Sequence, residues 1–101
     1  MIDDLRAKID EIDEKLVELM NRRASTALEI GQYKKKKNWG VTDEKREEAV
    51  LNRVNELNDG PFSDEQVERI YGQLISETKE IQKEIKVEVD EDDSSDEAGS
   101  N

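Results

Sequence analysis

The sequence predicts an all-α fold to which each chain contributes three helices. Apolar residues recur at spacings of three and four along three segments, turn-forming residues separate these segments, and no segment alternates apolar and polar residues as a half-exposed strand does. Of the 101 residues, 43% are charged and 33% are hydrophobic, which is too little apolar material for one small chain to bury alone. We therefore expect the fold to complete its core by association.

The first helix is predicted over residues 3–37, and Asn38-Trp39-Gly40 ends it. A helix of this length is about 50 Å long, twice the diameter of about 25 Å expected of a compact domain of this size. Half of it therefore needs a partner. Arg23 interrupts the apolar stripe, four residues from an apolar residue on either side, and so does not belong to the solvated face. The stripe consists of Leu5, Ile9, Ile12, Leu16, Leu19, Ala27 and Ile30.

The second helix is predicted from a cap at Thr42 or Asp43 to about Asn58, where the sequence Asn-Asp-Gly-Pro stops it. Its four-then-three spacing of apolar residues indicates one inward face. The residues on that face are Val50, Val54 and Leu57.

The third helix is predicted from a capping box formed by Ser63 and Gln66 to about Lys86. Polar residues interrupt its stripe as well, because Thr78 fills one of the apolar slots and Gln82 follows four residues later on the same face. The apolar members of the stripe are Val67, Ile70, Leu74, Ile81 and Ile85.

The sequence after the third helix is strongly acidic. Residues 87–101 hold seven acidic and no basic residues, which leaves 20 acidic and 16 basic residues, a formal charge of −4, in residues 1–86. Low hydrophobicity combined with a block of like charge is typical of disordered, solvated segments. We therefore divide the chain into a helical domain, 1–86, and an acidic disordered tail, 87–101, whose expected role is solubility.

The composition also excludes several classes of function. The chain has no Cys and no His, which excludes disulfides, Cys/His metal sites, thiol catalysis and imidazole acid-base chemistry, so we expect no metal and no cofactor. A formal charge of −11 argues against partners such as nucleic acid or an anionic membrane surface. No apolar run is long enough for a membrane span or a signal peptide, so we expect a cytoplasmic protein.

Charged and polar residues on the predicted helices nevertheless gather in a pattern. Arg23 and Lys34 are 11 residues apart, about 20° in projection and about 16 Å in rise, so both cations face one side of the first helix. Three charged residues also share one face of the second helix at its start. Each feature has a plain alternative: polar residues in a helix seam often only fix register, and surface ion pairs contribute little. The charged residues of the second helix are Asp43, Arg46 and Glu47.

Four sequence stretches resemble a known family. LRAKIDEIDEKLVELMNRR, ALEIGQYK, VTDEKREEAVLNRV and SETKEIQ follow one another, from residue 5 to about residue 82, as in the all-helical (AroQ-class, type II) chorismate mutases. The resemblance implies an intertwined homodimer of three-helix chains with two equivalent sites. It implies an isomerase of the shikimate pathway that converts chorismate to prephenate, in phenylalanine and tyrosine biosynthesis, without a cofactor.

By this resemblance, Arg23 and the partner subunit's Arg6 hold the two substrate carboxylates. Helix geometry agrees with a contribution from a second chain. Arg6 is about 26 Å from Arg23 and about 42 Å from Lys34 along one helix, whereas the substrate is about 10 Å across. One chain cannot bring all three residues to one substrate.

The resemblance also assigns residues to the reacting ether oxygen. Lys34 and Gln82 are implied as its two hydrogen-bond donors, and Lys34 as a second carboxylate contact. A Claisen rearrangement is unimolecular, so the protein needs no nucleophile or general base. It acts by selecting the compact conformer and by stabilising the negative charge that grows on this oxygen.

The remaining implied contacts come from the second and third helices. Glu47 and the backbone around Asp43 receive the ring hydroxyl, and Thr78 lies near a carboxylate. Arg46 orients Glu47 or adds positive potential.

Two other functions remain open at this point. An isochorismate-pyruvate lyase has a similar fold and shares the cationic residues and the glutamine, although Asp43 and Glu47 together favour the mutase. A noncatalytic dimerisation or regulatory module for a shikimate-pathway enzyme would suit the small size and the acidic tail. Such a module would have little structural reason to keep Arg23, Lys34 and Gln82.

Overall fold

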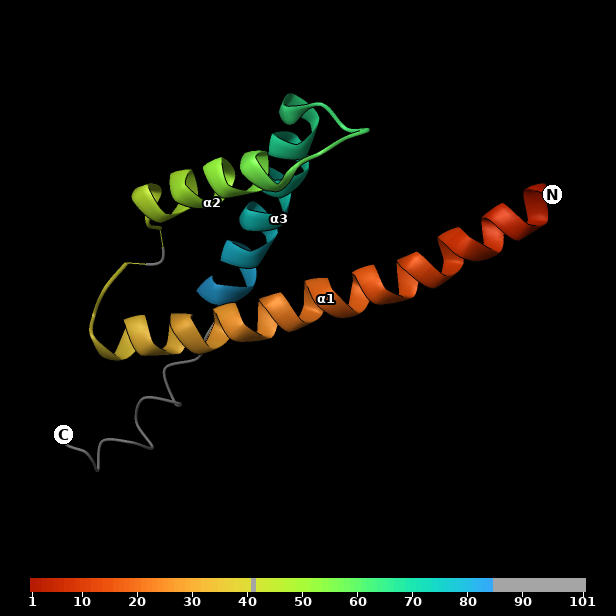
Figure 1. The fold of residues 1–101 in the computed structure, drawn as a ribbon. Helices are drawn as coiled ribbons and strands as arrows, with labels where there is room; N and C mark the ends of the chain where they lie inside the picture. The colour runs from red at the N-terminus through yellow and green to blue at the C-terminus, as the bar shows by residue number, and fades with distance from the viewer. Residues whose placement is uncertain (41, 85–101) are drawn as a thin grey trace.

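A computed structural model describes residues 1–40 and 42–84, and it confirms the all-α prediction. The chain forms three helices, α1 (Ile2–Lys36), α2 (Glu44–Leu57) and α3 (Asp64–Lys83), and the described residues contain no strand. Figure 1 shows α2 and α3 crossing above the C-terminal half of α1, while the N-terminal half of α1 extends away from both. The predicted residues Ile85 and Lys86 and the tail 87–101 lie outside the described residues.

The end of α1 follows from its last residues. Lys34, Lys35 and Lys36 stand in the final turn, where cations interact favourably with the negative end of the helix dipole. Asn38 then adopts the left-handed conformation at φ 62°, which Asn tolerates better than most residues. The Trp39 N–H donates to the Lys34 carbonyl at 2.7 Å and closes the helix.

The start of α2 is fixed by Asp43, one of the two predicted caps. Asp43 has extended backbone angles, and its carboxylate accepts a hydrogen bond from the Arg46 N–H at 3.1 Å. At the other end Asn58 organises the turn into α3, donating from Nδ2 to the Phe62 carbonyl and to the Asp64 carboxylate, both at 2.9 Å.

The predicted capping box at the start of α3 is confirmed. The Ser63 hydroxyl accepts from the Gln66 N–H at 3.2 Å, and the Ser63 N–H donates to the Gln66 side-chain oxygen at 3.0 Å. Two backbone donors that the helix itself leaves unpaired are therefore satisfied. These contacts fix the direction in which α3 leaves the turn.

The three helices of one chain do not enclose a core. No hydrophobic residue of the described chain is buried, and the apolar stripe on the N-terminal half of α1 is 50–60% exposed at Leu5, Ile9, Ile12, Leu16 and Leu19. The molecule extends 61 Å along its longest axis and 17 Å along its shortest. Exposed apolar surfaces of this extent are typical of interaction sites, so the predicted association stays a prediction that this exposure supports.

Three residues predicted to face inward on α2 and α3 are exposed in the single chain. Leu57, the last residue of α2, is 65% exposed, and Ile70 and Ile81 of α3 are 50% and 36% exposed. Val50 and Val54 are half-buried as predicted. None of the helices that the structure describes is sufficiently long and apolar to cross a membrane.

Candidate functional site

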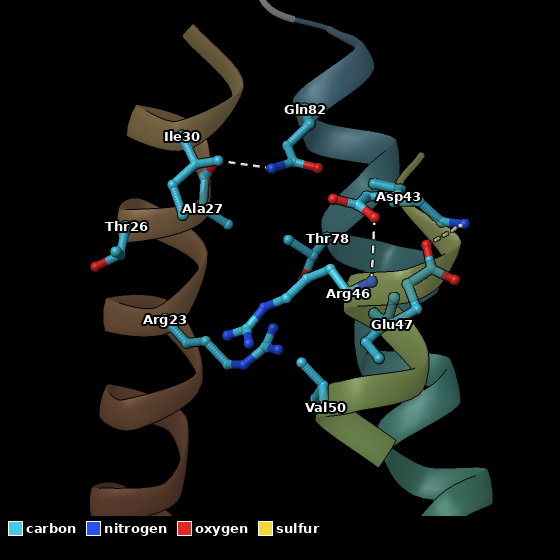
Figure 2. Close-up of a pocket in the computed structure, with 12 residues that line it drawn as sticks. Arg23, Thr26, Ala27, Ile30, Asp43, Arg46, Glu47, Val50, Thr78 and Gln82 are labelled. Atoms are coloured by element: carbon cyan, nitrogen blue, oxygen red, sulfur yellow. Dashed lines mark hydrogen bonds and ion pairs between the residues drawn. The ribbon is translucent and has the colours of Figure 1, made fainter. Parts of the chain in front are cut away.

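A pocket of about 240 Å³ opens where all three helices meet (Figure 2). It brings together six of the eight residues that the sequence singles out, and it leaves out Arg6 and Lys34. The six residues are Arg23 from α1, Asp43 from the cap of α2, Arg46 and Glu47 from α2, and Thr78 and Gln82 from α3.

Two arginines supply the positive charge of the pocket. Figure 2 shows the side chains of Arg23 and Arg46 pointing into the space between α1 and the other two helices. Neither guanidinium group forms an ion pair with a carboxylate of the described residues. The Arg23 guanidinium lies over the ring of Tyr71 on α3, 5.6 Å from its centre, a contact that orients the cation. Both cations are therefore available to an anion.

The carboxylates that line the pocket have partners. Asp43 accepts the N–H of Arg46 as the cap of α2. Glu47 forms an ion pair of 3.0 Å with Lys79 of α3, and a dashed line marks this pair in Figure 2. The negative charges therefore do not pair with the two arginines.

The polar residues of α3 are held by hydrogen bonds. Thr78 is 8% exposed, and its hydroxyl donates to the Leu74 carbonyl at 2.7 Å, so its oxygen is left as an acceptor. The Gln82 amide nitrogen donates to the Ala27 carbonyl on α1 at 2.7 Å (Figure 2). One of the two N–H groups of this amide remains for a ligand.

Lys34 lies in a neighbouring pocket of about 290 Å³ beyond Gln82. Gln82 lines both pockets, so the pocket of Lys34 adjoins the pocket of Arg23 at this residue. Trp39 lines the second pocket and packs edge-on against the Tyr33 ring, with ring centres 5.7 Å apart, in the anchoring role that its place in the loop favours.

Arg6 is remote from both pockets in the single chain. It lies on the protruding half of α1, its side chain is 70% exposed, and its only ion pair within the described residues is a contact of 3.9 Å with Asp3. The separation from Arg23 along the helix is about 26 Å. Arg6 therefore does not reach the pocket of its own chain.

Sequence reasoning missed Lys79. It lies between Thr78 and Gln82 in the sequence, but its pairing with Glu47 depends on how α2 crosses α3, which no local pattern encodes. The apolar lining residues Ala27, Ile30 and Val50, in contrast, belong to the stripes that helical spacing predicts. The described residues contain no group of three or more acidic side chains that could hold a metal ion.

Comparison with known proteins places this architecture in a family. Residues 5–83 match the family model for chorismate mutase type II. The chain is 36% identical over 88 residues to a bifunctional chorismate mutase/prephenate dehydratase of Aquifex aeolicus, covering 83% of this chain and 24% of the relative. It is 32% identical over 81 residues to a chorismate mutase of Methanocaldococcus jannaschii, covering 79% of this chain and 82% of the relative.

The fold comparison agrees with the sequence comparison. A chorismate mutase structure from Thermus thermophilus superposes with a TM-score of 0.80 at 26% identity, covering 81% of this chain and 93% of that chain. The chain spans about a quarter of the length of the bifunctional relatives it matches. The family match covers all three helices and the pocket between them, and the chain therefore belongs to the chorismate mutase type II family.

Proposed function

We propose that this chain catalyses the rearrangement of chorismate to prephenate in the pocket between its three helices. The observation that carries the proposal is the pair of guanidinium groups, Arg23 and Arg46, that point into one pocket without carboxylate partners among the described residues. The substrate is a dianion, and guanidinium groups bind carboxylates through charge-assisted, bidentate hydrogen bonds. A role in phenylalanine and tyrosine biosynthesis and a cytoplasmic location follow from this activity as predictions.

Binding selects the reactive conformer. Arg23 holds one substrate carboxylate, and the partner subunit's Arg6 holds the other. Arg46 adds positive potential, which is supported over a role in orienting Glu47 because Glu47 already pairs with Lys79. Fixing both carboxylates brings the two ends of the substrate into the compact chair in which the new C–C bond can form.

Electrostatic stabilisation then lowers the barrier. The ether C–O bond breaks as the C–C bond forms, no proton is transferred, and negative charge grows on the ether oxygen. Gln82 donates its second N–H to this oxygen while the first stays on the Ala27 carbonyl. Lys34 donates from the neighbouring pocket, on the other side of Gln82. Both donors act more strongly on the transition state than on the ground state.

The α2 end of the pocket receives the substrate ring hydroxyl. Glu47 and the backbone around Asp43 are the acceptors, and the Lys79 pair leaves one Glu47 oxygen for this bond. Thr78 lies near a carboxylate of the substrate. To donate to that carboxylate, its hydroxyl must turn away from the Leu74 carbonyl.

A second copy of this chain completes the site. The exposed apolar stripe of α1 packs against the partner, and the antiparallel pairing of two such helices carries the partner subunit's Arg6 to the Arg23 end of the pocket. The proposal is supported by the exposure of the stripe and by the distance of Arg6 from the pocket of its own chain.

The experiment follows the loss of chorismate absorbance and identifies the product as prephenate. We expect activity in the wild type and a fall in kcat/KM of at least about a hundredfold in Arg23→Ala and Gln82→Ala, since each removes a charged or oxyanion contact. Arg22→Ala is the matched control, because Arg22 is exposed and does not line the pocket, and it should retain wild-type rates. A folded wild type that leaves chorismate unchanged contradicts the proposal.

The lyase alternative is tested in the same preparation. Isochorismate is supplied in place of chorismate, and pyruvate release is measured. If pyruvate forms faster than chorismate is consumed, the pocket catalyses the lyase reaction.

A further inference from the structure

One cation that lines the pocket has no role in the mechanism above. Lys79 of α3 lines the pocket, and its ammonium group lies 3.0 Å from Oε2 of Glu47 on α2. The pair therefore joins the two helices that form one wall of the pocket. It also holds the carboxylate that is proposed to receive the substrate hydroxyl.

This pair differs from an ordinary surface ion pair in its burial. The Lys79 and Glu47 side chains are 27% and 29% exposed, whereas Lys83 and Glu80, on the same helix, are 61% and 64% exposed at a separation of 4.0 Å. Solvent and salt screen exposed pairs, and they contribute little. Because the Lys79–Glu47 pair is shielded from solvent, its charges act through a lower effective dielectric constant and therefore more strongly.

The formal charges of the pocket give Lys79 a second effect. The other charged residues that line it are two arginines and two carboxylates, whose formal charges cancel. Lys79 brings this sum to +1, and through its ion pair it offsets the charge of Glu47 toward an anionic substrate. Without Lys79, the Glu47 carboxylate would face an anionic substrate uncompensated.

We propose that Lys79 is a positioning residue of this site, which fixes the Glu47 carboxylate for the substrate hydroxyl and neutralises its charge toward the substrate. The inference rests on the proposed function. Lys79 acts through Glu47 and does not touch the substrate. Its effect is equal on ground state and transition state, because neither the hydroxyl contact nor the net charge changes as the ether bond breaks.

The test measures kcat and KM for chorismate in the wild type and in four variants. Lys79→Met removes the charge at similar length, and Lys79→Arg restores it. Glu47→Gln is made alone and together with Lys79→Met. Lys45→Met is the matched control, since Lys45 is exposed on α2 and lines neither the pocket of Arg23 nor that of Lys34.

We expect Lys79→Met to raise KM about tenfold and to change kcat by less than about threefold. Lys79→Arg should keep KM within about threefold of the wild type, which also shows that the site tolerates substitution. The double variant should resemble Glu47→Gln alone, because without the carboxylate there is nothing for Lys79 to position. The KM of Lys79→Met should also depend less steeply on ionic strength, an effect that a purely structural role would not produce.

Three outcomes overturn the inference. An unchanged KM in Lys79→Met shows that the pair is incidental, while the proposed function stands on the wild-type activity. Effects of Lys79→Met and Glu47→Gln that multiply in the double variant show that Lys79 acts independently of Glu47 and does not position it. A wild type without mutase activity contradicts the proposed function and this inference with it.

Discussion

Individual side chains of the pocket are held by contacts that cross from one helix to another. Gln82 on α3 donates to the Ala27 carbonyl on α1, Glu47 on α2 pairs with Lys79 on α3, and Arg23 on α1 lies over Tyr71 on α3. Groups held in place before the substrate arrives lose little freedom on binding. The pocket is therefore preorganised at Arg23, Glu47 and Gln82.

The Arg23–Tyr71 contact leads to a prediction about the activity of Tyr71 variants. Tyr71→Phe keeps the aromatic face and should keep kcat/KM within about twofold. Tyr71→Leu removes the face and should lower kcat/KM roughly fivefold, which corresponds to the loss of about 1 kcal/mol of cation–π interaction. Steady-state kinetics of the two variants measure the effect. Equal values for the Phe and Leu variants would show that the ring does not orient Arg23.

The site residues differ in how far sequence could predict them. Periodicity places Arg23 on the inner face of its helix, and the structure finds it in the pocket. The same reasoning puts Arg23 and Lys34 on one side of their helix, and in the structure they line two adjoining pockets that share Gln82. The role of Lys79 could not be predicted, because its partner Glu47 is 32 positions away in sequence and contacts it only through the packing of α2 on α3.

The helices as elements were predictable because their ends carry local signals. The capping box at Ser63 and the lysine-rich end of α1 are both visible in the sequence and confirmed in the structure. The cap of α2 was ambiguous because Thr42 and Asp43 can both accept a backbone N–H, and only the extended backbone at Asp43 decides between them. Local sequence therefore predicts where a helix begins. Which face of the helix is buried depends on the packing of the other helices, so it is harder to predict.

The capping box leads to a prediction about how much the Ser63 cap stabilises α3. Ser63→Ala removes the acceptor for the Gln66 N–H and should lower the free energy of unfolding by about 1 kcal/mol. Ser76→Ala, at an exposed position inside α3, is the control and should change stability little. Urea unfolding at one fixed protein concentration measures both, since the stability of an associating chain depends on concentration. Equal stability of the two variants would show that the cap does not stabilise α3.

At the scale of the whole molecule, one chain leaves its apolar surface uncovered. Its described residues bury no hydrophobic side chain, the N-terminal half of α1 stands clear of α2 and α3 (Figure 1), and the pocket lacks Arg6. The low apolar content predicts association, and the length of the first helix predicts that its protruding half faces the partner. The exposed apolar stripe and Arg6, which is proposed to complete the partner's site, belong to the same helix.

The central claim, that two copies share each site, is tested by mixing Arg6→Ala with Arg23→Ala. Each variant alone should be inactive, because each removes one of the two carboxylate contacts from both sites. Chains unfolded and refolded together in equal amounts should regain about a quarter of wild-type activity, since half of the dimers are mixed and one of their two sites is intact. Wild-type chains taken through the same refolding provide the reference. Full activity of Arg6→Ala alone, or a mixture as inactive as its components, would contradict the shared site.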